Sequence, residues 1–438
     1  MTAAAAGTMP FASAAEPAEA PALRQSGTLS DGSTYALERP AEWNGDLVVL
    51  PGRETLDATA VRWLVEQGYG AVGYDLSSGW DLERDRDNAE EALGVFEDAA
   101  GEADAVVVAG RSQGGLVTRI IADRQPEWLD GALPMCGGGA GAISTWNYKL
   151  DTAFALKELV DPDSPMALQG ITDRAAEVQA LNDLVDAAAS TPEGRARTVL
   201  AAALSKIPAT DPTTGEELED LDQRIDRYLE HMPFAAGSHV RHGYEQTVGG
   251  TFSWNTGVDY EKLLKQSGRW AEIRAAYRQA GLSLQEDLHA LDTAERFSAD
   301  VESVEFVERT ATFSGELSAP LLSLHTTGDG AGTTADDAAY ASTVRSAGSG
   351  SQLRQVFVAA DGHCTFTAAE EATAFTVLFD RIDSGRWDAT SPRALERIGA
   401  QVNDASALEV GETRFTRAQH SGAPVRMWDY RNWGDYTG

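Results

Sequence analysis

Short apolar runs alternate with segments of helical spacing in two separate parts of the chain. The runs have the length of buried strands and lie at residues 46–50, 70–74, 105–109, 131–136, 320–324 and 355–359. Segments with apolar residues every three or four positions lie at 57–67, 82–99, 115–123, 334–346 and 367–381. Strands that alternate with amphipathic helices predict a mostly parallel sheet with helices on both faces, which places the chain in the α/β class.

Two further patterns complete the predicted organisation. Residues 26–38 alternate in polarity around Asp31-Gly32, which predicts a hairpin. From about 144 to 309 the strand pattern disappears and helical periodicity remains, which predicts a helical cap inserted in the second half of the sheet. The predicted divisions are a leader, 1–24, a core, 25–143 and 310–395, the cap, 144–309, and a C-terminal tail packed on the core, 396–438.

The two ends of the chain differ in composition from its centre. Residues 1–20 are rich in alanine, and Ala12-Ser13-Ala14 is typical of the cleavage site of a secretory signal. The first basic residue is Arg24, so we interpret this segment as the remnant of a signal peptide and expect a secreted protein. The tail carries late aromatic residues that we expect to pack against the core, namely Trp428, Tyr430, Trp433 and Tyr436.

The charge balance narrows the possible partners. The chain has 68 acidic and 35 basic residues and a net charge of −33. Such a surface repels phosphate backbones and anionic membranes, so we expect neither nucleic acid nor membrane as a partner. The charge favours a neutral or cationic small-molecule substrate. The histidine and carboxylate spacings match no zinc or calcium site, and no phosphate or dinucleotide loop occurs, so we predict no metal and no cofactor.

One motif carries the chemistry. Gly110-Arg111-Ser112-Gln113-Gly114 is a G-x-S-x-G sequence that directly follows an apolar run and directly precedes a helical segment. A sharp turn between strand and helix exposes the serine hydroxyl at the carboxyl edge of the sheet and at the positive end of the helix. We therefore predict that Ser112 is a nucleophile and that the backbone N–H of Gln113 stabilises an oxyanion.

A serine nucleophile needs a base, and the base needs an acid that orients it. His363 lies in the loop after the last apolar run, at the predicted sheet edge of Ser112, whereas His325 lies at the end of a strand and is expected to pack behind the site. Asp329 follows the preceding run and is the predicted acid. The alternatives for the acid are Asp336, Asp337 and Asp361. The order Ser112, Asp329, His363 is the order expected for an α/β-hydrolase.

The other site residues are predicted from their places beside these strands. A second oxyanion donor is expected in the loop after the first central strand, from Gly52 or Arg53. Trp80 follows the next strand and is expected in a pocket wall. The cap should supply the rest of the lining from its aromatic residues. The aromatic residues chosen in the cap are Trp146, Phe252 and Trp254, of which Phe252 and Trp254 lie in a glycine-rich, non-helical stretch and have the best claim to face the pocket.

Together these features make the chain resemble the α/β-hydrolase superfamily over about 26–143 and 310–390. The resemblance implies an eight-stranded, mostly parallel sheet and acyl-group chemistry, without fixing a substrate. The block at 133–151 is similar to secreted bacterial esterases that carry a cap.

A narrower resemblance concerns the two cysteines. Secreted tannase and feruloyl-esterase-like enzymes place a cysteine directly after the catalytic histidine, as Cys364 follows His363 here. Their second cysteine precedes the serine and forms a disulfide with the first, but Arg111 stands at that position here. Cys136 ends a strand at the same sheet edge, so we expect it to form the disulfide with Cys364.

These inferences predict a secreted serine hydrolase that cleaves a carboxylic ester or lactone through an acyl-enzyme. An acyltransferase or a macrolactone-processing enzyme is the main alternative, because it would use the same acyl-enzyme with another acceptor. A peptidase and a catalytically inactive binding module are further alternatives. The intact order of serine, aspartate and histidine argues against the inactive module.

Overall fold

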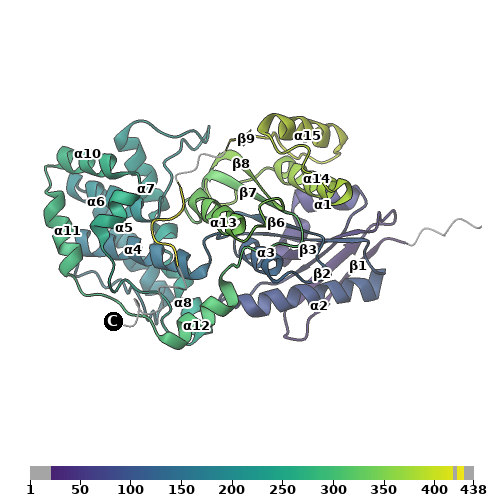
Figure 1. Ribbon diagram of the computed structural model, residues 1–438, viewed down its shortest axis with the longest axis horizontal. Helices are drawn as coiled ribbons and strands as arrows, with labels where there is room; N and C mark the ends of the chain where they lie inside the picture. Colours follow the sequence, from purple (N-terminus) through teal and green to yellow (C-terminus); the bar gives the residue numbers. More distant parts are fainter. Residues whose placement is uncertain (1–20, 418–421, 429–438) are drawn as a thin grey trace, which may run out of the picture.

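A nine-stranded sheet forms the centre of the molecule (Figure 1). The computed structural model describes residues 21–417 and 422–428, and within them the strand order is β1-β2-β4-β3-β5-β6-β7-β8-β9. The strands are β1 (Leu23–Thr28), β2 (Thr34–Arg39), β3 (Asp46–Pro51), β4 (Gly70–Tyr74), β5 (Ala105–Arg111), β6 (Gly131–Met135), β7 (Leu321–Gly328), β8 (Leu353–Asp361) and β9 (Phe415–Thr416). The strands β3 to β8 run parallel, and the predicted hairpin is the antiparallel pair β1–β2.

The parallel strands are buried because their side chains alternate between two cores. In β3, Leu47 and Val49 point into one core, whereas Val48 and Leu50 point into the other. A strand covered on both faces needs apolar side chains at every position, which is why these strands read as continuous apolar runs. The sheet has nine strands, one more than predicted, because β9 pairs antiparallel with β8. β9 contains only two residues, which is too few to give a recognisable sequence pattern.

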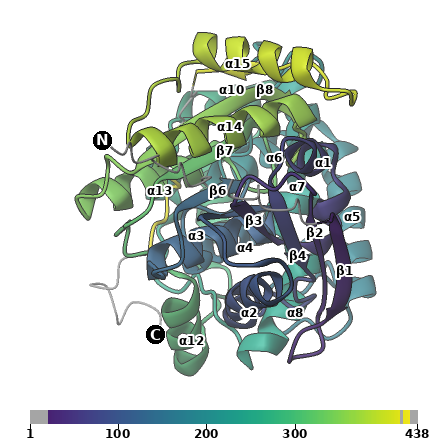
Figure 2. The same cartoon turned by 90° about the vertical axis from the view of Figure 1, so that its right-hand side faces the viewer.

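Helices cover both faces of the sheet, as Figure 2 shows. The core that contains Leu47 also receives α2 (Leu82–Ala100), α3 (Gln113–Arg124) and α13 (Thr334–Ser346). The core that contains Val48 receives α1 (Thr59–Glu66), α14 (Ala368–Ser384) and α15 (Pro392–Ala405), and a short 3-10 helix, Arg53–Asp57, precedes α1. The predicted α/β class with helices on both faces is therefore confirmed.

The helices between β6 and β7 form a separate layer beside the sheet, on the left of Figure 1. They are α4 (Ala142–Val160), α5 (Arg174–Ala189), α6 (Pro192–Leu204), α7 (Leu221–Ala236), α8 (Ser238–Val248), α9 (Tyr260–Gln266), α10 (Trp270–Ala280), α11 (Leu284–Thr293) and α12 (Val301–Ala311). Most of this layer has an apolar core of its own, in which Phe154, Leu200 and Tyr228 are fully buried. We call this layer the cap.

The tail contacts both layers of the molecule. After β9, Arg426 donates to Asp151 of α4 at 2.8 Å, and the ring of Trp428 meets that of Trp254 with centroids 5.3 Å apart. The tail was predicted to pack on the core alone, and these contacts add the cap. The other predicted tail aromatics, Tyr430, Trp433 and Tyr436, lie outside the described residues.

The N-terminal prediction is partly corrected. Residues 1–20, with the predicted cleavage site, lie outside the described residues. Leu23 and Arg24 were assigned to the leader, but they begin β1, where they pair with Arg39 and Glu38. No helix in residues 21–417 or 422–428 is long and apolar enough to cross a membrane.

Candidate active site

Ser112 occupies a sharp turn between β5 and α3. Its backbone has φ 55° and ψ −117°, and its N–H donates to the carbonyl of Met135 at 2.9 Å. Non-glycine residues at positive φ are uncommon and cluster at functional sites. The same sign of φ occurs at Trp80, Cys136 and Cys364, which all lie at or beside this site.

The glycines of the motif are required by close backbone contacts. A Cβ atom on Gly114 would lie 2.3 Å from the carbonyl oxygen of Pro51, and one on Gly115 would lie 2.6 Å from that of Met135. A Cβ on Gly110 would meet the backbone of Gly114 at 2.5 Å. The turn can therefore sit between β3 and β6 only because these positions carry no side chain.

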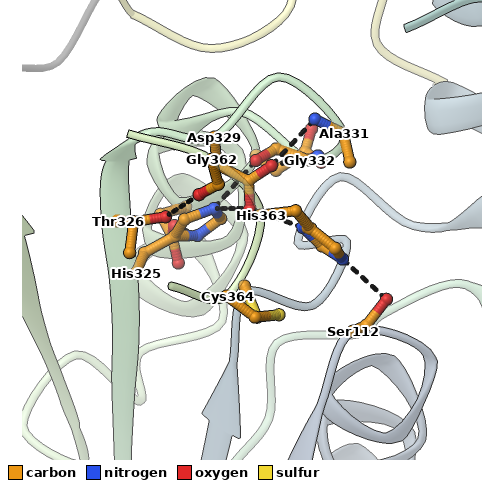
Figure 3. Close-up of polar contacts among 12 residues, drawn as sticks. Ser112, His325, Thr326, Asp329, Ala331, Gly332, Gly362, His363 and Cys364 are labelled. Atoms are coloured by element: carbon orange, nitrogen blue, oxygen red, sulfur yellow. Dashed lines mark hydrogen bonds and ion pairs between the residues drawn. A yellow bond between two sulfur atoms is a disulfide. The ribbon is translucent and has the colours of Figure 1, made fainter. Parts of the chain in front are cut away.

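The structure brings the three predicted catalytic residues together (Figure 3). His363 Nε2 lies 2.7 Å from Ser112 Oγ, and His363 Nδ1 lies 2.7 Å from Asp329 Oδ2. Asp329 is fully buried, whereas a quarter of the His363 side chain is exposed. These are the distances expected for a nucleophile, a base and an acid that orients the base.

Asp329 is held by more than His363. Its Oδ1 accepts the backbone N–H groups of Ala331 at 2.8 Å and Gly332 at 3.1 Å. Its Oδ2 also lies 3.2 Å from Nε2 of a second imidazole, that of His325 (Figure 3). The carboxylate therefore sits between two imidazole rings and is oriented by two backbone donors.

The contacts of His325 favour its charged form. Nε2 lies 2.8 Å from the carbonyl oxygen of Gly332, which can only accept, so Nε2 carries a proton. Nδ1 lies 2.5 Å from Oδ2 of Asp337, a contact at ion-pair distance without hydrogen-bond geometry. Asp337 is itself ion-paired with the buried Arg119 at 2.6 Å, which keeps it ionised. His325 thus lies between two buried carboxylates, which favour the imidazolium form of its ring.

Burial and charge act in opposite directions on the pKa values of this group. Burial alone would raise the pKa of Asp329, but the adjacent His363 and the hydrogen bonds from His325 and His363 hold it well below its usual range. Burial alone would lower the pKa of His325, but Asp337 and Asp329 hold it well above its usual value. In both cases burial is the largest single effect, and the opposite charges and hydrogen bonds together outweigh it.

A disulfide joins Cys136 and Cys364, as predicted, with their Cα atoms 5.6 Å apart. Cys136 directly follows β6, and its N–H donates to the carbonyl of Leu324 at 2.9 Å. Cys364 directly follows His363. The bond therefore ties the loop that carries the imidazole to the strand beside Ser112.

Gly52 and Arg53 were the two candidates for the second oxyanion donor, and the N–H group of one of them already forms a hydrogen bond within the sheet. The N–H of Gly52 donates to the carbonyl of Tyr74 at 3.0 Å, so only Arg53 is retained from this pair. On the other side, the Gln113 side chain donates to Ser77 O at 3.0 Å and to Asp85 Oδ2 at 2.8 Å. These bonds fix Gln113 at the N-terminal end of α3, which is the positive end of the helix.

A cavity of about 280 Å³ opens beside the serine and is walled by both layers. The core contributes Trp80, Ser112, Gln113, Cys136, Gly138, Ala331, Gly332, Asp336 and His363, and the cap contributes Thr145, Trp146, Lys149, Phe234, Gly237 and Val240. Two of the predicted lining residues, Trp80 and Trp146, therefore lie in its wall. Their rings contact each other with centroids 5.4 Å apart.

The other two predicted lining residues do not reach this cavity. Phe252 is fully buried against Trp146 and Tyr244, and Trp254 is buried against Trp428 of the tail. A glycine-rich stretch predicted exposure there, but α8 and the tail cover it.

The alternatives for the acid also have other partners. Asp361 accepts from Thr210 at 2.9 Å and forms an ion pair with Arg227, both in the cap. Asp337 pairs with Arg119, and Asp336 accepts from Tyr148 at 3.0 Å.

Sequence reasoning missed Lys149 and Asp336 as cavity residues. One signal was available for Lys149. It lies, with Asp151, in a helix whose apolar residues over 142–156 are distributed around the whole circumference instead of along one face. A helix of that kind is buried, so a lysine within it is a buried cation.

The strand order, the serine turn after β5 and the chain order of the three residues are together those of the α/β-hydrolase fold, which confirms the predicted fold. No family model matches the chain. The chain is 27% identical over 428 residues to the o-phthalyl amidase of Xanthobacter agilis, an alignment that covers 89% of this chain and 92% of that protein.

Solved structures of similar fold include esterases and lipases. Feruloyl esterase B from Aspergillus oryzae aligns with a TM-score of 0.38 and 14% identity, over 83% of this chain and 80% of that chain. Candida antarctica lipase A in its closed state aligns with a TM-score of 0.39 and 10% identity, over 87% of this chain and 86% of that chain.

The contacts of Gly114 predict that a single methyl group disables the turn. Gly114→Ala should slow the labelling of Ser112 by a fluorophosphonate about 100-fold, because the new Cβ must push α3 away from Pro51. Gly94→Ala in α2 is the matched control, since nothing lies within 4 Å of its Cβ. Equal labelling rates for the two variants would contradict the close-contact argument.

Removal of the disulfide should lower the stability of the protein. Cys136→Ser combined with Cys364→Ser should lower the free energy of unfolding by about 2–5 kcal/mol, measured by urea denaturation. Denatured wild type should titrate no thiols before reduction and two afterwards. Two titratable thiols without reductant would show that the bond is absent.

The imidazolium of His325 predicts a defined pH dependence of stability. Folding raises its pKa, so its stabilisation is complete below the unfolded value of about 6.5 and decreases as the pH rises toward the folded value. His325→Gln should cost about 3–5 kcal/mol near pH 6, because two buried carboxylates lose the cation between them.

Above about pH 6.5 the difference between wild type and His325→Gln should shrink by up to about 1.4 kcal/mol per pH unit. Urea denaturation at several pH values measures it. His289→Gln, at an exposed position of α11, is the control. A difference that stays constant with pH would mean that His325 is neutral.

Proposed function

We propose that the protein is a serine hydrolase that cleaves a carboxylic acid derivative through an acyl-enzyme on Ser112. The observation that carries this proposal is the pair of 2.7 Å contacts that link Ser112 Oγ to His363 and His363 to Asp329. A serine at a strained turn, beside an oriented imidazole and a cavity, is the arrangement that acyl transfer requires.

The proposed reaction proceeds in two steps. In the first, Ser112 Oγ bonds to the substrate carbonyl carbon while His363 Nε2 takes the hydroxyl proton, and His363 then returns it to the leaving alcohol or amine. In the second, His363 takes a proton from water while the water oxygen bonds to the acyl carbon. The bond from that carbon to Ser112 Oγ then breaks, His363 returns the proton to Ser112 Oγ, and the free acid leaves. Asp329 holds the imidazole and stabilises its charged form.

The negative oxygen of each tetrahedral intermediate needs donors. Gln113 N–H, at the start of α3, is the first, and Arg53 N–H is proposed as the second. Trp80 and Trp146 supply flat apolar surface for the substrate.

The bond that is cleaved has two candidates. The sequence-based prediction is an ester, and the same acyl-enzyme serves an ester or a lactone. The similarity to an o-phthalyl amidase favours an amide as the second candidate. Amide cleavage makes stronger use of His363 as an acid, because an amine leaves only after it is protonated.

Export from the cell is part of the same proposal. The disulfide Cys136–Cys364 supports it, since such bonds persist in oxidising compartments. The second support is the alanine-rich composition of residues 1–20 with Ala12-Ser13-Ala14, which is typical of the cleavage site of a secretory signal.

The first experiment identifies the nucleophile. Wild type treated with a fluorophosphonate should gain the mass of one adduct, and Ser112→Ala should gain none and lose hydrolysis of phenyl and methyl esters by at least about 1000-fold. Ser144→Ala is the control, because this buried serine lies in α4 outside the cavity wall.

The outcomes separate the competing functions. An adduct on Ser112→Ala, or none on either protein, would contradict an activated Ser112 and favour an inactive module. An adduct together with transfer of the acyl group to an added alcohol, in preference to water, would favour an acyltransferase.

A further inference from the structure

A buried ammonium group lies in the wall of the cavity beside Ser112. Lys149 projects from α4 and is 7% exposed. Its Nζ donates to the carbonyl oxygens of Phe234 and Ala331, each at 2.8 Å. An ammonium has three protons, so these two bonds leave one for a group in the cavity.

This cation has no counter-ion of its own. In the part of the chain that the structure describes, Lys149 forms no ion pair with a carboxylate. Burying a charge without a partner is costly. Burial accordingly lowers the pKa of Lys149 to about 8, although Asp336 and Asp329 attract the charge from a distance. An anion in the cavity would remove this cost.

A second group in the same wall is suited to donate to an anion. Asp336 is fully buried and accepts from the hydroxyl of Tyr148 at 3.0 Å. Burial, together with the nearby charge of Asp337, raises the pKa of Asp336 to about 7. Near neutral pH a large share of this carboxyl group therefore carries a proton that it can donate.

The rest of the wall suits a flat ring. Trp80, Trp146 and Phe234 are its large apolar members, and Phe234 lies near His363 with ring centroids 6.4 Å apart. The cavity thus combines apolar surface, a nucleophile and one buried cation.

We propose that Lys149 binds a free carboxylate on the acyl group of the substrate, next to the carbonyl that Ser112 attacks. The substrates are then half-amides or half-esters of a dicarboxylic acid, and the o-phthalyl group is the acyl group used to test this. This inference rests on the proposed function and adds to it the residue that selects the acyl group. The similarity to an o-phthalyl amidase suggests the phthalyl group as the acyl group to test. The buried ammonium group of Lys149 is the physical reason to expect a free carboxylate on it.

The test compares substrates that differ only in charge. Monomethyl phthalate carries the free carboxylate, and dimethyl phthalate has the same ortho geometry with a neutral ester in its place. The amide pair is 2-carbamoylbenzoate and its methyl ester. Wild type should have the higher kcat/KM for the anionic member of each pair.

Two variants separate recognition from packing. Lys149→Met should lower the ratio of kcat/KM, anionic over neutral, about 10- to 100-fold, since a bond to a charged group is lost. Lys157→Met removes the other lysine of α4, whose Nζ donates to the carbonyl of Met166 at 2.8 Å away from the cavity, and should leave the ratio unchanged. If Lys149→Met slows both substrates equally, Lys149 only ties Phe234 to Ala331 and the inference is wrong.

A measurement on wild type keeps the test decisive if Lys149→Met does not fold. Phthalate should protect Ser112 from a fluorophosphonate at about tenfold lower concentration than benzamide, which has the same ring and no charge. The advantage should decline from about pH 6 to about pH 9, because Asp336 gains charge and Lys149 loses it. The charged groups that act on Lys149 are Asp336, Asp329 and Arg241.

The two proposals fail in different ways. Equal protection by phthalate and benzamide, with Ser112 still labelled, would overturn the role of Lys149 and leave the serine hydrolase standing. Absence of labelling on Ser112 would overturn the proposed function itself.

Discussion

A carboxylate without exposed surface is stable only where the surrounding groups replace the solvation that water would supply. Asp329 receives two backbone N–H bonds and lies between the imidazoles of His363 and His325. His325 is in turn balanced by Asp337, and Asp337 by Arg119. The chain of alternating charges is neutral as a whole, which is the condition under which so many ionised groups can be buried together. The orientation of His363, and with it the contact to Ser112, depends on this arrangement.

The same loop connects the charge network to the cap. Ala331 gives its N–H to Asp329 and its carbonyl to Lys149, whose other bond goes to the carbonyl of Phe234 in the cap. A substrate group that binds Lys149 would therefore contact the point at which cap, cavity and acid meet. The tail adds a second connection where Arg426 binds Asp151 on the same helix, so α4 is held from the core side and from the tail side.

Features that depend on short motifs and on the shared carboxyl edge of the sheet could be predicted from the sequence, including the Cys136–Cys364 disulfide, whereas contacts that depend on how the cap and the tail pack could not. The strands β3 to β8, the turn at Ser112 and the order of Ser112, Asp329 and His363 depend on apolar runs and short motifs, which a sequence displays directly. Phe252 and Trp254 were placed in the pocket because their stretch is rich in glycine, but α8 and the tail cover them. The engagement of the Gly52 N–H depends on where β4 lies beside β3, which no local pattern specifies. His325 was expected behind the site, but the raised pKa of its ring depends on contacts with Asp329 and with Asp337, in the first turn of α13, which no local pattern displays.

Net charge and local charge give opposite expectations for the substrate. A chain with a net charge of −33 favours neutral or cationic ligands at long range. In physiological salt, however, exposed charges are screened over about 8 Å, whereas a buried cation is screened much less. Once an anionic group has entered the cavity, Lys149 is the nearer and less screened charge. The acidic surface therefore acts on the rate at which such a substrate arrives, while the affinity of the bound state is decided by the ammonium group in the wall.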